Sequence, residues 1–307
     1  MMRPLSLIAA AISYAVLSSS NVWAQDLPGL ETVADIPSNG FNENIFESEG
    51  GAFFVTGAFE SAVWKITEGG SVEKFATFPN HPVVLGIAGI PDGFAIGAFR
   101  RPFRTPAGTD FSNVGSEVVL LDDEGNITGT VSGEMGSVFN GMAPDGHGRA
   151  LISDSQLSKI WRFDPATKSL TVWIEDEALA PASASSLGAN GLRVVNGWVY
   201  VANRSQMSIY KMQMGSDGAP VGPFVLAADK LPAADDFAVG PDGSIYIPPA
   251  GQNKPLTRIF PDGKRTELIA RAPAGASAIV SRNGRWVYWA TGFEFGHQRL
   301  VRVAIPN

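Results

Sequence analysis

The strongest constraint on the fold is an internal pattern that recurs six times along the chain. In five of the six copies a polar or small residue stands at the head of an apolar stretch, in the sixth a leucine stands there, and in each copy two further apolar runs of β-forming residues follow. The copies begin at Glu43, Leu85, Asn140, Asn190, Asp235 and Ala276, which lie 42, 55, 50, 45 and 41 residues apart. This spacing is the length of a four-stranded propeller blade. The pattern therefore predicts an all-β, six-bladed β-propeller with four-stranded antiparallel blades around a central channel.

Turn residues agree with this prediction. Asp-Gly and Asn-Gly pairs stand between apolar runs, where a hairpin needs residues that tolerate positive φ; they begin at Asp92, Asn196, Asp242, Asp262 and Asn283. No stretch has a helical period long enough for βαβ crossovers. A β-sandwich or two small β domains would not require the near-constant spacing. We therefore expect residues 25–307 to form a single propeller domain, with residues 100–116 as an inserted loop.

The composition narrows the chemistry that the chain can perform. Its 307 residues include no cysteine, which excludes thiolate metal sites and a cysteine nucleophile. Lys and Arg total 23 against 30 Asp and Glu, a formal net charge of -7. Because nucleic-acid binding depends on basic side chains that neutralise phosphates, we expect no nucleic-acid partner.

The first 24 residues have the pattern of a secretory signal peptide. Arg3 supplies one positive charge, residues 5–17 form an apolar run, and cleavage is expected after Ala24. A membrane anchor is the alternative, but crossing a bilayer needs about 20 apolar residues. We therefore expect a periplasmic or secreted protein that has no membrane partner once residues 1–24 are removed.

The first residues of the six copies should converge, because the innermost strand of each propeller blade lines the channel. Four of the six carry side-chain oxygen atoms: Glu43, Asn140, Asn190 and Asp235. Oxygen ligands suit a hard divalent cation, so we predict that these four residues bind calcium, with magnesium or manganese as alternatives. Each of them alone is also a common turn or strand-end residue. The prediction therefore depends on their equivalent places in the repeat.

Three segments resemble a known family. They are NGMAPDG from Asn140, NGL from Asn190 and DDFAVGPDG from Asp235. These segments are similar to the senescence marker protein, gluconolactonase and luciferin-regenerating enzyme family of six-bladed propellers, and the similarity covers essentially the whole chain after residue 24. The resemblance implies that Glu43, Asn140, Asn190 and Asp235, in the order Glu, Asn, Asn, Asp, bind a catalytic divalent cation. The chain departs from the family's Glu-Gly-Pro after Glu43 and from its Asp-Gly in the fifth blade, which leaves Asp236 as an alternative to Asp235.

The resemblance and the predicted site favour a divalent-metal-dependent hydrolase of a small lactone or related ester. In this hypothesis the cation polarises the carbonyl, and Asp235 takes a proton from the attacking water. His81, Phe139 and Arg193 are the expected contacts to the substrate. The alternatives are a non-catalytic propeller with a structural cation, phosphotriester hydrolysis, and a condensation or lyase reaction. A closed ring of blades also leads us to expect a monomer.

Overall fold

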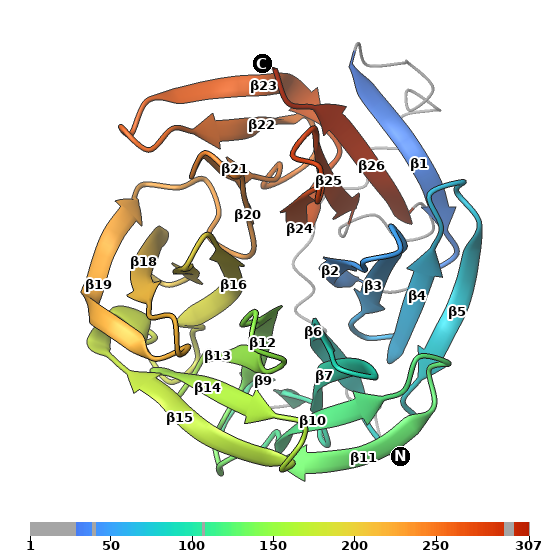
Figure 1. The fold of residues 1–307 in the computed structure, drawn as a ribbon, viewed down its shortest axis with the longest axis vertical. Coiled ribbons are helices and arrows are strands. Elements are labelled where there is room, and N and C mark those ends of the chain that lie inside the picture. Colours follow the sequence, from blue (N-terminus) through green and yellow to red (C-terminus); the bar gives the residue numbers. More distant parts are fainter. Residues whose placement is uncertain (1–28, 39–40, 106–107, 292–297, 307) are drawn as a thin grey trace, which may run out of the picture.

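The computed structural model describes residues 29–38, 41–105, 108–291 and 298–306. Their strands form six four-stranded antiparallel sheets around one axis (Figure 1), which confirms the predicted six-bladed propeller. Residues 1–24 lie outside the described residues, so the signal peptide and its cleavage after Ala24 remain predictions. In the described part of the chain the helical element is the 3-10 turn η1 (Glu177–Leu179), and no helix there is long and apolar enough to cross a membrane.

The first five blades follow one another along the chain, and the strands of each run from the channel outward. Blade 1 consists of β2 (Asn42–Glu47), β3 (Phe53–Gly57), β4 (Ala62–Ile66) and β5 (Val72–Thr77). Blade 2 consists of β6 (Val83–Ile90), β7 (Gly93–Phe99), β10 (Ser116–Leu121) and β11 (Ile127–Ser132). Blade 3 consists of β12 (Phe139–Pro144), β13 (Ala150–Asp154), β14 (Lys159–Asp164) and β15 (Ser169–Glu175). Blade 4 consists of β16 (Ala189–Val195), β17 (Trp198–Asn203), β18 (Ser208–Met214) and β19 (Pro220–Ala228). Blade 5 consists of β20 (Ala238–Val239), β21 (Ile245–Ile247), β22 (Lys254–Ile259) and β23 (Arg265–Ala272).

Blade 6 closes the ring by joining strands that are far apart in the sequence. It consists of β24 (Gly275–Val280), β25 (Trp286–Thr291), β26 (Gln298–Ala304) and, as its outermost strand, β1 (Leu30–Ile36). The ion pairs Arg302–Glu31 (2.7 Å) and Arg299–Asp35 (3.0 Å) accompany the antiparallel ladder between β1 and β26. The N-terminal strand thus completes the last blade, a closure that the repeat does not reveal.

The predicted hairpin turns have the backbone conformation that their residues favour. In the turn between β6 and β7, Asp92 and Gly93 have φ of 62° and 142°, and in the turn between β16 and β17, Asn196 and Gly197 have φ of 50° and 74°. Asp, Asn and Gly tolerate these angles better than other residues. Apolar side chains of neighbouring blades then pack face to face and form the core between the blades.

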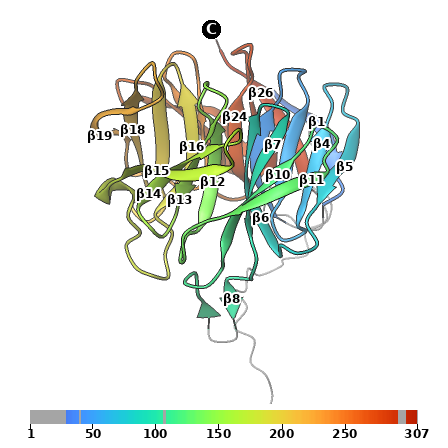
Figure 2. The ribbon, with the colours of Figure 1, turned by 60° about the horizontal axis from the view of Figure 1, so that its bottom comes forward.

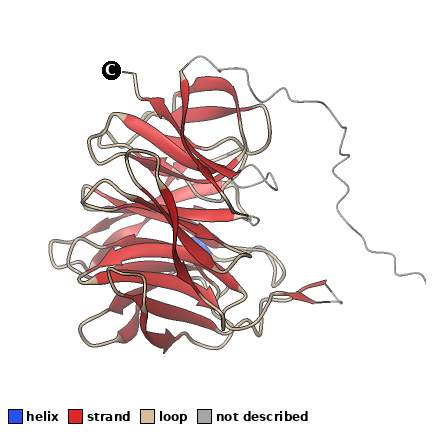
Figure 3. Cartoon of the chain, turned by 90° about the vertical axis from the view of Figure 1, so that its right-hand side faces the viewer, coloured by secondary structure: helices blue, strands red, loops and turns tan. Residues whose placement is uncertain are grey.

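The inserted residues after β7 include a short hairpin of β8 (Arg104–Thr105) and β9 (Gly108–Thr109), which stands out from the ring (Figure 2, Figure 3). Val83, at the start of β6, pairs with Phe99, at the end of β7. The insertion therefore leaves the ring at the end where the innermost strands begin, which we call the mouth of the channel. The prediction of an inserted loop in blade 2 is confirmed.

The innermost strands approach one another most closely at glycines near the mouth. A Cβ on Gly141 would lie 2.5 Å from the backbone oxygen of Asn190 in blade 4. A Cβ on Gly86 would lie 2.2 Å from the backbone oxygen of Asn140 in blade 3. Neither glycine has a positive φ. Glycine is therefore needed at these positions because the neighbouring backbone leaves no room for a side chain.

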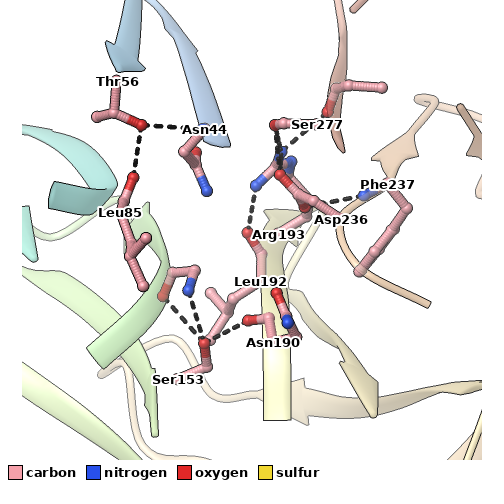
Figure 4. A network of polar contacts seen from close by, with 12 residues as sticks. Asn44, Thr56, Leu85, Ser153, Asn190, Leu192, Arg193, Asp236, Phe237 and Ser277 are labelled. Carbon is pink, nitrogen blue, oxygen red and sulfur yellow. Dashed lines mark hydrogen bonds and ion pairs between the residues drawn. The ribbon is translucent and has the colours of Figure 1, made fainter. Parts of the chain in front are cut away.

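Hydroxyl groups from the second strands connect the innermost strands at the same level (Figure 4). The hydroxyl of Ser153 accepts a hydrogen bond from the N–H of Gly141 (2.9 Å) and donates one to the backbone oxygen of Asn190 in the next blade. Thr56 of blade 1 likewise donates to the backbone oxygen of Leu85 in blade 2 (2.7 Å). These bonds fix the first residues of adjacent blades relative to one another.

Replacing Gly141 with alanine tests this close approach. The added methyl group would push blade 3 away from blade 4, so we expect Gly141→Ala to lower the free energy of unfolding in urea by about 1–3 kcal/mol, the usual cost of overpacking. Gly50→Ala is the control, because the nearest atom to its added Cβ is 4.0 Å away, and its effect should stay within about 0.5 kcal/mol. Equal effects of the two substitutions would contradict this role of Gly141.

Candidate functional site

The residues that begin the copies of the repeat lie near the start of the innermost strands, where the pairing with the second strand is interrupted. In blade 1 the register shifts between Asn42 and Ile45, at the position of Glu43. The register shifts in the same way around Asn140 in blade 3 and around Asn190 in blade 4. A bulge of this kind bends the strand and redirects a side chain. The fold therefore brings the same irregularity to the mouth of the channel in these three blades.

Asp235 reaches the mouth from blade 5 without being part of a strand. The innermost strand β20 begins only at Ala238. The backbone oxygen of Asp235 accepts a hydrogen bond from the N–H of Gly191 (2.9 Å), and its Oδ1 accepts one from Nδ2 of Asn190 (3.0 Å). The carboxylate of Asp235 is therefore held against the first residues of blade 4.

Glu43 is buried at the mouth and lies close enough to Asp235 for their charges to interact. Burial raises the pKa of Glu43 well above its ordinary value, and the negative charge of Asp235 raises it further. The positive charge of Arg204 acts in the opposite direction. Two carboxylates in a poorly hydrated site favour protonation of one of them unless a cation is nearby.

Arg204 supplies a positive charge to this site, although the sequence pattern does not single it out. It follows directly after β17, the second strand of the blade that provides Asn190. Its Nη1 forms an ion pair with Oδ1 of Asp235. The negative charge of Asp235 is the main cause that raises the pKa of Arg204, and Glu43 adds to the effect. The one sequence signal for Arg204 is its place at the mouth end of a strand in blade 4.

Asp236 belongs to a separate, buried network that joins blades 4, 5 and 6 (Figure 4). Its Oδ2 accepts hydrogen bonds from Nη2 of Arg193 and from the hydroxyl of Ser277, both 2.5 Å long. The Nη2 atom of Arg193 also donates to the backbone oxygen of Ala278 (2.9 Å). Asp235 and Asp236 thus have different partners: Asp235 faces Asn190 and Arg204, whereas Asp236 holds the wall of the ring together.

Arg193 does not have the position expected of a substrate contact. Its side chain is buried, and its guanidinium group is used to bridge Asp236 and the innermost strand of blade 6. The contacts observed for Arg193 thus give it a structural role, and its contact with a substrate remains a prediction. The sequence could not show this, because the partners come from two other blades.

His81 and Phe139, the other two expected substrate contacts, also lie inside the protein. His81 is buried, and its Nε2 is 2.9 Å from Oε2 of Glu117 on β10. Phe139 is fully buried and packs edge to face against Trp161, with 6.4 Å between ring centroids. Both side chains are thus engaged within the ring, and in this conformation neither is available to a ligand at the mouth.

Blade 2 differs from the polar blades at the mouth because its copy of the repeat begins with Leu85. Leu85 belongs to an apolar cluster that also contains Val83, Phe99, Phe111 and Val138. The polar groups at the mouth therefore come from blades 1, 3, 4 and 5, whereas blade 2 contributes a buried apolar side chain.

The oxygen donors at the mouth are of the chemical kind that a hard divalent cation binds. Among the described residues no three His, Cys, Asp or Glu side chains form a metal-binding group, so a cation would need both asparagines as well as Glu43 and Asp235. The side chains of Glu43 and Asn140 form no hydrogen bond within the described part of the chain. In the structure Nδ2 of Asn190 faces Asp235, because this orientation of the carboxamide allows the hydrogen bond between them. Rotating the carboxamide by half a turn would place its Oδ1 at the same point, where it could bind a cation. Calcium and magnesium bind sets of carboxylate and carbonyl oxygens of this kind.

Comparison with known proteins shows which fold this is. No protein-family model and no curated protein sequence matches the chain. The structure is similar to a gluconolactonase from Xanthomonas campestris, with a TM-score of 0.64 and 14% identity over 90% of this chain and 89% of that chain. It is also similar to a luciferin-regenerating enzyme, with a TM-score of 0.63 and 11% identity over 89% of this chain and 94% of that chain. The chain thus has the fold of the family that its sequence resembles.

The same fold also occurs in a protein with another activity. A virginiamycin B lyase from Staphylococcus aureus has a TM-score of 0.57 and 12% identity over 90% of this chain and 99% of that chain. At such identities the likeness concerns the fold alone. The function must therefore be inferred from the side chains at the mouth.

Asparagine substitutions distinguish the two neighbouring aspartates. Asp236→Asn leaves Arg193 buried without its anionic partner, so the free energy of unfolding should fall by about 3 kcal/mol or more. Asp235→Asn removes the partner of the half-exposed Arg204, and the expected change is below about 1 kcal/mol. Urea unfolding in metal-free buffer measures both. If Asp235→Asn proved the more damaging substitution, the structural role assigned to Asp236 would be wrong.

Proposed function

We propose that this protein is a divalent-metal-dependent hydrolase that opens a lactone or a related ester at the mouth of the channel. The observation that carries the proposal is the contact between Asp235 and Asn190, beside a Glu43 whose pKa responds to Asp235. Together with Asn140, these residues would hold the cation. A set of oxygen donors favours calcium, with magnesium or manganese as alternatives. The likeness in fold to a gluconolactonase supports a lactone as the substrate class.

Asp235 is the best-placed general base. When bound, the cation would polarise the substrate carbonyl as a Lewis acid. The contacts that the described residues make to the carboxylate of Asp235, from Asn190 and Arg204, are both to Oδ1. Oδ2 is therefore the oxygen that can take a proton from water.

The reaction balances with water as the one co-reactant. The water oxygen forms a bond to the carbonyl carbon while its proton passes to Oδ2 of Asp235. The bond between that carbon and the ring oxygen then breaks, and Asp235 returns the proton to the ring oxygen as it leaves. The product is the open-chain hydroxy acid, and Asp235 returns to its starting state.

The proposal also includes the location, the partners and the oligomeric state of the protein. The signal-peptide pattern of residues 1–24 supports a periplasmic or secreted location. The net charge of -7 supports the absence of a nucleic-acid partner. Closure of the ring by β1 of the same chain supports a monomer.

Hydrolysis assays test the proposal on a panel of lactones, aryl esters and phosphotriesters. We expect the purified protein to open lactones, a chelator to abolish turnover, and calcium, magnesium or manganese to restore it. Asp235→Asn should lower kcat/KM by about 100-fold or more, which is the typical contribution of a general base.

Asp123→Asn is the control for the change in charge, because Asp123 is exposed in the turn between β10 and β11. Its kcat/KM should match that of the wild type. A protein that binds the cation but turns over no member of the panel would be a binding propeller and not a hydrolase. Turnover that survives complete removal of metal would refute metal dependence.

A further inference from the structure

The ion pair between Arg204 and Asp235 lies within the proposed cation site. Nη1 of Arg204 contacts Oδ1 of Asp235, and the negative charges of Asp235 and Glu43 both stabilise the guanidinium group. Asp235 and Glu43 are also the two anionic members of the proposed ligand set. The guanidinium group therefore neutralises the same carboxylates that a divalent cation would neutralise.

Arg204 is held less firmly than Arg193, whose buried guanidinium group bonds to Asp236. The side chain of Arg204 is 46% exposed, and Asp235 is its ion-pair partner among the described residues. The backbone of Arg204 is fixed, because its N–H donates to the backbone oxygen of Gly188 (3.0 Å). The guanidinium group can therefore leave Asp235 for solvent while the strand end stays in place.

We propose that Arg204 is an internal counter-cation that competes with the divalent cation for Asp235. This inference rests on the proposed function, because it requires a cation site at the mouth. Like charges repel strongly at short distance in a poorly hydrated site, so a divalent cation bound to Asp235 displaces the guanidinium group. In the metal-free protein, Arg204 offsets the repulsion between Asp235 and Glu43.

The competition has a measurable consequence because coupling between two binding events is reciprocal. The ion pair weakens cation binding by the same factor by which the cation weakens the ion pair. Removing the charge of Arg204 should therefore tighten cation binding. Because Arg204 is not itself a ligand, this effect would act through Asp235. A residue that merely stabilised the fold would not have this effect.

Isothermal titration calorimetry of metal-stripped protein with calcium tests the inference. We expect Arg204→Gln to bind calcium about 10-fold more tightly than the wild type, within the usual range of coupling between two binding events. Arg204→Lys keeps the charge and should bind less tightly than Arg204→Gln.

Arg282→Gln is the matched control. The side chain of Arg282 is 53% exposed and pairs with Glu49 at 3.5 Å, so its loss changes the net charge by the same amount away from the mouth. Its calcium affinity should equal that of the wild type.

Nitrogen NMR of the arginine side chains gives a second measurement on the wild-type protein itself. The Nη–H signal that disappears in Arg204→Gln should be protected from exchange in the metal-free protein, because Nη1 contacts Asp235, and should lose that protection when calcium is added. Calcium binding that is equal or weaker in Arg204→Gln, with an unchanged Arg204 signal, would overturn the inference and leave the metal-dependent hydrolase standing. Failure of the wild type and of Arg204→Gln to bind calcium, magnesium or manganese would overturn the cation site itself and the inference with it.

Discussion

The close approach of the innermost strands around the channel is the constraint on which the rest of the structure depends. At Gly141 the backbone of the next blade leaves no room for a side chain, and the hydroxyl of Ser153 bridges the two strands. This packing accompanies a shift of register at the start of each of these strands. The shifted positions hold Asn140 and Asn190. The geometry that closes the ring therefore also places Asn140 and Asn190 at the mouth of the channel.

The charged residues of the innermost strands and of the mouth form two pairs with different properties. Asp236 and Arg193 are both buried, and together with Ser277 they fix the blades that they connect. Asp235 and Arg204 form a pair in which the arginine is half exposed. A buried pair is costly to break, whereas a more exposed pair is weaker and more easily exchanged. The protein thus keeps one ion pair for its architecture, and we propose that the second one makes way for a ligand.

The sequence predicts the fold, and it predicts the end of the channel at which the candidate site lies. Both depend on a repeat that the spacing of its copies along the sequence reveals. Glu43 and Asn190 could be located for that reason. The roles of Arg193 and Arg204 could not be predicted, because they depend on which side chains reach across from one blade to another. Which of Asp235 and Asp236 belongs to the candidate cation site could not be predicted either, because it depends on contacts of the same kind. The closure by β1 has no sequence signal, since this strand completes a blade at the other end of the chain.

Diffraction from crystals soaked in manganese, recorded at a wavelength where manganese scatters anomalously, tests the central claim most directly. The account predicts one strong anomalous peak at the mouth, in contact with side-chain oxygens of Glu43, Asn140, Asn190 and Asp235. It also predicts that the guanidinium group of Arg204 has moved away from Asp235. A mouth without a peak, or a peak beside an Arg204 that still pairs with Asp235, would contradict the account.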